Sequence, residues 1–182
     1  AAVTGERFTD ANAIEYVQEA RYHVLVLRGF SKIYGLANLR VGYSRRYKDR
    51  YLIAKEQIVQ GRVGKITGAA ARVYNSRSQA LAILKRNPEA TPVVDALTYY
   101  VDLMNWLLEG NAPVEVFARG QQGVLKQAGY DVDDVNWAIL TYADGAVVNL
   151  GVSYSLPEKY PSLGHAARVE ILGTEGVMIL DD

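Results

Sequence analysis

The stretch PVVDALTYYVDLMNWLLEG, residues 92–110, has the pattern of one helix with two differently occupied faces. Apolar side chains recur in it at spacings of three and four, which predicts a stripe that packs against a core. The ends are also marked, because Thr91 can cap the helix, Pro92 suits its first position and Gly110 can take the left-handed conformation that ends it. The stripe consists of Val94, Leu97, Val101, Met104 and Leu108.

A second face of this helix carries polar or amphipathic side chains at the same periodicity. They are Asp95, Tyr99, Asp102 and Trp106. Side chains aimed together in this way form a candidate site. The alternative is a solvated helix face on which Tyr99 and Trp106 pack as ordinary amphipathic residues.

The composition limits the classes of function. The chain has 182 residues, enough for one domain or for a domain with an appended piece. Lys and Arg number 20 and so do Asp and Glu, so no broad positive field favours nucleic acid or an anionic membrane. With no cysteine and only two histidines, neither a disulfide framework nor a metal site is expected.

The apolar runs argue against a membrane protein. The run at 23–27 is far shorter than the roughly 20 residues that a spanning helix requires. The first residues have neither a basic leader nor a long apolar stretch, so no signal peptide is expected. We therefore expect a soluble, cytoplasmic protein, in keeping with the absence of cysteine.

The run RGFSKIYGLANLRVGY, residues 28–43, follows a predicted helix and a predicted buried strand. It resembles the segment around the cofactor lysine of histidinol-phosphate aminotransferases, so residues 1–43 are expected to be an aminotransferase-like helix-strand segment. The resemblance implies that Lys32 would form a Schiff base with pyridoxal phosphate, while Ser31 and Arg40 would bind the phosphate. An imine needs an amine, and a phosphate suits a hydroxyl together with an arginine fork.

Parts of this segment depart from the aminotransferase pattern. Gly29 stands where a threonine is common and Asn38 where a glycine is common. No later residue matches the aspartate that would bind the pyridine nitrogen. We therefore expect no functional pyridoxal phosphate site and an ordinary, exposed Lys32.

Three later stretches resemble a different family. They are LRVGYSRRYKDRYLIAKEQIVQGRVGKI (39–66), PVVDALTYYVDLMNWLLEGNAPVEVFA (92–118) and LGTEGVMIL (172–180). In this order they are similar to the C-terminal domain of the glucose-fructose oxidoreductase and inositol dehydrogenase family, Gfo/Idh/MocA. The resemblance implies a domain over 44–182, a sugar or polyol as substrate, and NAD or NADP as the cofactor of the parent enzymes.

The same resemblance implies a catalytic pair. The family has an aspartate and, four residues later, a histidine that together face the substrate; Asp95 and Tyr99 hold these positions here. A phenol can donate a hydrogen bond but is a poor base near neutral pH. The sequence also lacks the family's Glu-Lys-Pro motif and a glycine-rich dinucleotide turn, so we expect no cofactor in this chain and no catalysis by it alone.

Further candidate substrate-binding residues come from the helix and from a predicted strand over 65–77. Asp102 lies on the polar helix face, and Arg72 and Asn75 lie on the strand. The two strand residues could reach a polyol or sugar, or could equally point outward.

The remaining patterns predict the fold class. Helical patterns at 47–60 and 79–85 precede two hairpins, whose strands are 135–139 with 147–154 and 168–172 with 177–180. We therefore expect an α+β (α/β) fold, an open and largely antiparallel sheet with helices on one face, preceded by a short helix-strand unit. A last strand so close to residue 182 suggests a truncated domain.

An uncovered sheet face predicts self-association, because monomers seldom expose a large apolar patch. The residues expected on this face are Val135, Trp137, Ile139, Val169 and Ile171. The favoured function is thus the substrate-binding and oligomerisation domain of an NAD(P)-dependent oxidoreductase. The alternatives are a non-catalytic structural or dimerisation domain and a chimera without native activity.

Overall fold

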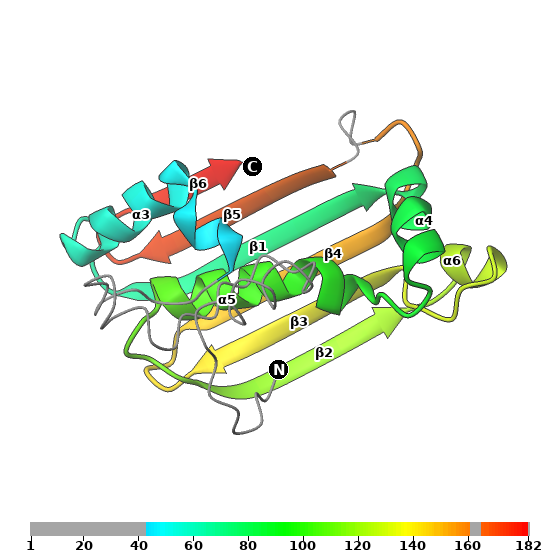
Figure 1. Cartoon of the computed structure of the whole chain (residues 1–182). Coiled ribbons are helices and arrows are strands. Elements are labelled where there is room, and N and C mark those ends of the chain that lie inside the picture. The colour runs from blue at the N-terminus through cyan, green and yellow to red at the C-terminus, as the bar shows by residue number, and fades with distance from the viewer. Residues whose placement is uncertain (1–42, 161–164, 182) are drawn as a thin grey trace, which may run out of the picture.

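The computed structural model describes residues 43–160 and 165–181. In this part of the chain six strands form one sheet, in the order β2-β3-β4-β1-β5-β6, and helices cover one face of it (Figure 1). The strands are β1 (Ile66–Ser76), β2 (Pro113–Gln121), β3 (Val135–Tyr142), β4 (Val147–Leu156), β5 (His165–Gly173) and β6 (Val177–Asp181). The helical elements are η1 (Ser44–Tyr47), α3 (Asp49–Val59), α4 (Arg77–Arg86), η2 (Val93–Leu97), α5 (Thr98–Leu107) and α6 (Val124–Gln127).

The sheet is antiparallel at every pairing except one, which confirms the predicted fold class. The exception is β1 with β4, which run parallel at the centre of the sheet. This pair was not predicted, because four helical elements and the strands β2 and β3 separate β1 from β4 along the chain, and sequence periodicity does not indicate which distant strands become neighbours. The predicted helix-strand unit over residues 1–43 lies almost entirely outside the described residues.

Strand β1 shows how the two faces of the sheet differ. Ala69, Ala71 and Val73 are buried beneath the helices, and the residues between them, including Arg72, are only partly buried. Because side chains alternate along a strand, the odd-numbered residues face the helices and the even-numbered residues face the uncovered side. These three residues belong to the hydrophobic core.

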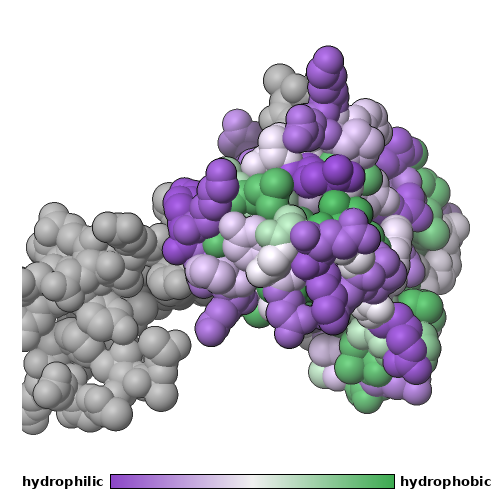
Figure 2. All heavy atoms as spheres, turned by 90° about the vertical axis from the view of Figure 1, so that its right-hand side faces the viewer, coloured by the Kyte–Doolittle hydropathy of each residue, from purple (hydrophilic) through white to green (hydrophobic). Residues whose placement is uncertain are grey.

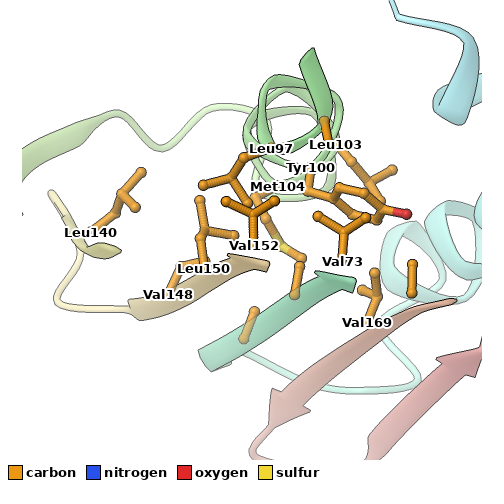
Figure 3. Close-up of a cluster of buried hydrophobic side chains, with 14 of the residues drawn as sticks. Val73, Leu97, Tyr100, Leu103, Met104, Leu140, Val148, Leu150, Val152 and Val169 are labelled. Carbon is orange, nitrogen blue, oxygen red and sulfur yellow. The ribbon is translucent and has the colours of Figure 1, made fainter. Parts of the chain in front are cut away.

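The core lies between α5 and the central strands (Figure 3). On α5 and the turn before it, the buried side chains of Leu97, Tyr100, Leu103 and Met104 point toward the sheet. They meet side chains from three strands: Val73, Val148, Leu150, Val152 and Leu140. Most of the helix is therefore fixed by apolar packing, which is the main source of helix stability in globular proteins.

The predicted stripe of the helix is correct at its centre and wrong at its start. Leu97, Met104 and Leu108 are buried, but Val94 is 68% exposed. The reason is the turn η2, which is π-helical: the N–H of Thr98 donates to the carbonyl oxygen of Val93, five residues back. A wider turn changes which residues share a face, and a period of 3.6 residues cannot anticipate it. Gly110 has φ of 91°, as expected for the end of this helix.

The prediction for the uncovered face of the sheet is also partly wrong. Trp137 and Ile139 are exposed on it, but Val169 and Ile171 are fully buried beneath the helices. The alternation in β5 is offset by one residue from the prediction, so Arg168, Glu170 and Leu172 take the uncovered side. Trp137 lies over Gly151, where a Cβ would clash with its ring. Seen from the end of the sheet near α4 and α6, exposed hydrophobic residues form separate patches among hydrophilic ones (Figure 2).

Candidate functional site

The candidate site is centred on Asp95, which lies in the π-helical turn η2 above the end of β4. The hydroxyl of Tyr154, near the end of β4, donates a hydrogen bond to Oδ2 of Asp95. Tyr154 is fully buried, whereas Asp95 is partly exposed. The pair therefore joins a buried donor to a carboxylate that solvent, or a ligand, can reach.

Asn75 is the third member of this cluster. It is buried at the end of β1, next to β4, and its side chain hydrogen-bonds the Tyr154 hydroxyl. Burial raises the pKa of Tyr154 far above its usual value, and the hydrogen bond to Asp95 and the charge of that carboxylate raise it further. Tyr154 therefore stays protonated and remains a hydrogen-bond donor throughout the physiological pH range.

Tyr99 lies one helical turn after Asp95. It is partly buried, and it is near enough to Tyr154 to disfavour ionisation of that hydroxyl. Its ring packs edge-on against Tyr43, with the centroids 5.1 Å apart. Within the described residues its own hydroxyl makes no hydrogen bond. The structure thus brings together three of the predicted residues, Asn75, Asp95 and Tyr99.

Asp102 has a different environment. The guanidinium of Arg46, on η1, donates from Nε to Oδ2 at 2.6 Å and from Nη2 to Oδ1 at 2.5 Å. The same guanidinium lies 5.9 Å from the centroid of the Trp106 ring. Both carboxylate oxygens of Asp102 are thus engaged by Arg46, so the second half of the polar helix face packs against η1 rather than facing the cluster around Asp95.

Arg72 lies on the opposite side of the sheet from Asn75. The two residues are three positions apart on β1, and an odd separation along a strand places side chains on opposite faces. Arg72 pairs in register with Arg168 and Gly151, on the uncovered face. It therefore does not join the cluster.

The remaining candidates concern cofactors and metals. Lys32, Ser31 and Arg40 lie outside the described residues. Among the residues that the structure does describe, no group of three or more His, Asp or Glu side chains could hold a metal ion.

Neither strand-to-helix junction of the described chain fits a dinucleotide. Between β1 and α4 there is no glycine, and the Ser76 hydroxyl already accepts a hydrogen bond from the Gln79 N–H. Between β2 and α6, the Asp134 carboxylate accepts from the N–H groups of Val124 and Leu125, at 2.7 and 2.8 Å. A pyrophosphate needs such N–H groups to be free, and those of Gln79, Val124 and Leu125 are already engaged by side chains of this chain.

Tyr154 is the member of the cluster that the sequence patterns did not single out. It continues the series Val148, Leu150 and Val152, which are buried on the helix side of β4. A tyrosine at a core position usually finds a partner for its hydroxyl, which is the signal that could have identified it.

A comparison with protein families matches residues 51–179 to the model of the GFO/IDH/MocA C-terminal domain. The chain belongs to this family. Inositol 2-dehydrogenase from Acidothermus cellulolyticus is 26% identical to it over 149 residues, which are 82% of this chain and 40% of that protein. The chain therefore spans about two fifths of the length of this curated relative.

Solved structures show the same fold. Myo-inositol 2-dehydrogenase from Lactobacillus plantarum superposes with a TM-score of 0.65 at 24% identity, over 75% of this chain and 40% of that one. Scyllo-inositol dehydrogenase from Lactobacillus casei, solved with bound NAD(H) and scyllo-inositol, gives a TM-score of 0.64 at 24% identity, over 79% and 42%.

A second relative matches a short stretch only. Histidinol-phosphate aminotransferase from Moorella thermoacetica is 56% identical over 41 residues, which are 22% of this chain and 10% of that protein. The chain thus resembles two unrelated families, as its sequence patterns indicated. In the described part of the chain, no helix is both long enough and apolar enough to span a membrane.

Proposed function

We propose that this chain is the substrate-binding domain of an NAD(P)-dependent oxidoreductase that acts on a sugar or polyol, and that it is not catalytic alone. The observation that carries the proposal is the convergence of Asn75, Asp95, Tyr99 and Tyr154 at one end of the central strands. Membership of the family and the inositol dehydrogenases among its relatives support the substrate class.

The chemistry of the cluster suits a molecule with several hydroxyl groups. Each hydroxyl can donate one hydrogen bond and accept others, so a site for it needs both kinds of partner. Asp95 supplies an acceptor, because Oδ1 makes no hydrogen bond within the described residues. Tyr99 supplies a hydroxyl that can donate or accept. In this proposal Asp95 and Tyr99 contact the substrate, and Asn75 supports them from β1.

The proposal assigns no redox step to this chain. Because N–H groups at both strand-to-helix junctions already have side-chain partners, we assign the cofactor and its hydride chemistry to a separate domain of a complete enzyme. The chain binds and orients the alcohol that such a domain would oxidise. We retain the cytoplasm as the proposed compartment, because a chain without cysteine suits a reducing environment.

The test is a titration of the ¹⁵N-labelled chain with myo-inositol, gluconate and glucose. We expect saturable chemical-shift changes at Asp95 and Tyr99 with at least one of them. Asn75→Ala should weaken binding, and Arg72→Ala, on the opposite face of the same strand, should leave it unchanged. Absence of a saturable response to all three compounds would contradict the proposal.

We also propose that the uncovered sheet face joins copies of this chain. Large apolar side chains are exposed at both of its ends, for example Phe117 on β2 and Ile179 on β6, at 57% and 54%. Between them Arg168 forms ion pairs with Glu170 and Asp181, at 2.8 and 3.8 Å. A face with apolar ends and charges of both signs can complement a second copy of itself about a two-fold axis.

Sedimentation velocity tests this association. The parent chain should sediment as a dimer or larger species at micromolar concentration, and Ile139→Lys, in the exposed apolar part of the face, should shift it toward monomer. Val59→Lys is the matched control, since Val59 is exposed on α3, on the helix side. A parent chain that sediments as a monomer would contradict the proposal.

We infer further that the chain joins two unrelated segments. Support comes from the match to an aminotransferase over 41 residues beside the match to the oxidoreductase family over 51–179. The run LRVGY, residues 39–43, suits both families and marks the junction. Sequencing the source gene across residue 39 and its flanking DNA tests this: oxidoreductase coding sequence that continues directly into residue 39, without the codons for residues 1–38, would contradict it.

A further inference from the structure

Tyr154 is held in place by contacts that do not involve a ligand. Its side chain is fully buried, and its backbone N–H donates to the carbonyl oxygen of Asp134 at 2.8 Å. The carboxylate of Asp134 in turn caps α6 through two backbone N–H groups. The backbone at Tyr154 is thus tied to the residue that caps α6, and its ring lies in the core beneath the helix that carries Asp95.

The hydroxyl of Tyr154 has one proton, and the structure shows where it goes. It is donated to Oδ2 of Asp95, while the side chain of Asn75 hydrogen-bonds the hydroxyl oxygen. Because the phenol stays protonated, this donation persists across the physiological pH range. Tyr154 therefore acts on Asp95 and has no second proton to offer a ligand.

This arrangement fixes the orientation of the Asp95 carboxylate. With Oδ2 held by Tyr154, the other oxygen, Oδ1, has no hydrogen bond within the described residues. Asp95 lies in the π-helical turn η2, beside Tyr99. A carboxylate that can no longer rotate freely offers one oxygen in one direction, which reduces the entropy lost when a hydroxyl binds to it.

We propose that Tyr154 is a positioning residue of the polyol site, which holds Asp95 so that its free oxygen accepts a hydrogen bond from one substrate hydroxyl. The inference rests on the proposed function, which assigns the polyol to Asp95. Asn75 completes the arrangement by keeping the Tyr154 hydroxyl directed at Oδ2.

The chain contains a matched control for this role. Tyr142, on β3, is also buried, and its hydroxyl donates to Oδ1 of Asn105 on α5 at 2.8 Å. Asn105 lies ten residues after Asp95, about 15 Å along a helix. Tyr154 and Tyr142 thus hold opposite ends of the same helical segment, and only Tyr154 touches the candidate site.

The experiment measures the affinity of the 182-residue chain for myo-inositol, gluconate and glucose by calorimetry, in the parent, Tyr154→Phe and Tyr142→Phe. Each variant removes one buried hydroxyl and keeps the ring, so both should lower the unfolding midpoint. We expect Tyr154→Phe to weaken binding about tenfold, as loss of a hydrogen bond to a charged group does, and Tyr142→Phe to leave it within about twofold. In an Asp95→Asn background the effect of Tyr154→Phe should largely disappear.

The possible results separate the two proposals. If the parent binds one of these compounds and Tyr154→Phe binds it equally well, the positioning role is wrong and the polyol site stands. The same conclusion follows if Tyr142→Phe weakens binding as much as Tyr154→Phe, because the effect is then one of stability. If the parent binds none of myo-inositol, gluconate and glucose, the proposed polyol site is wrong and the role of Tyr154 in it is wrong too.

Discussion

The contact between Arg46 and Asp102 gives a prediction that separates structural from ligand-binding residues on one helix. Both residues are mostly buried, with side chains 21% and 15% exposed, and two charge-assisted hydrogen bonds join them. Replacing Asp102 with alanine removes both bonds and leaves the guanidinium without this partner. We expect the variant to be less stable than the parent and to keep its affinity for a polyol.

The size of the loss follows from the geometry. A hydrogen bond to a charged group contributes about 1.5–3 kcal/mol when it is buried, and a fully exposed ion pair contributes at most about 1 kcal/mol. Arg46 and Asp102 lie between these limits, so we expect Asp102→Ala to lower the free energy of unfolding by about 1–2 kcal/mol. In a chain of this size that corresponds to a fall of about 2–8 °C in Tm.

Thermal and urea unfolding measure the loss, and titration with the polyol that binds the parent measures affinity. Glu109→Ala is the matched control, because Glu109 lies in the turn just after α5, its side chain is 47% exposed, and its ion pair with Lys55 is longer, at 3.5 Å. It should change the free energy of unfolding by less than about 0.5 kcal/mol. Arg46→Ala should be as destabilising as Asp102→Ala, and the double variant should add little to either.

Two results would refute this reasoning. An Asp102→Ala variant with unchanged stability would show that the pair contributes nothing to the fold. An Asp102→Ala variant that kept its stability but bound the polyol several times more weakly would show that Asp102 takes part in substrate binding.

Two further predictions follow from the turns of the sheet. A Cβ built on Gly173 would lie only 2.8 Å from the carbonyl carbon of Val63 and would clash with that backbone. Gly173→Ala should therefore lower the free energy of unfolding in urea by about 1–3 kcal/mol. An unchanged unfolding midpoint would contradict this. Hydrogen bonds from the Ala146 N–H and the Asn111 amide lower the pKa of Asp144. A lowered carboxyl pKa stabilises the fold above the unfolded-state value, and this contribution is lost as pH falls through the folded-state value. The protection of the Ala146 amide, measured as its exchange rate relative to the intrinsic rate at each pH, should therefore fall at acidic pH in the parent and show no such fall in Asp144→Asn.

The sequence predicts which segments form helices and strands better than it predicts which strands pair with each other. The helix around residues 92–110 and the hairpin of β3 and β4 depend on local patterns, and both lie close to where they were expected. The parallel pairing of β1 with β4 depends on contacts between distant segments, which no local pattern encodes. The register of β5 was wrong by one residue, and that error placed Val169 on the wrong face.

The same difference holds for the candidate site: the residues on one helix were predicted, and the residue from a distant strand was not. Asp95 and Tyr99 were predicted from one helix, and their proximity follows from helical spacing. Tyr154 could not be assigned to them, because it reaches Asp95 only through the pairing of β4 with β1 and the packing of the helix above. Arg72 and Asn75 were predicted together, although their odd separation on β1 already requires opposite faces.

The parallel pair at the centre of the sheet also bears on the order in which the chain folds. The β3–β4 hairpin closes over a short turn, whereas Gly68 pairs with Val147 and Ala69 with Ile171, partners far along the chain. Closing such long loops costs entropy before any contact repays it, so assembly through distant pairs is slow. We expect the amides of β3 to gain protection from exchange earlier in refolding than those of β1. The strand that carries Asn75 would then be docked late, and the cluster around Asp95 would be completed only once the middle of the sheet has closed.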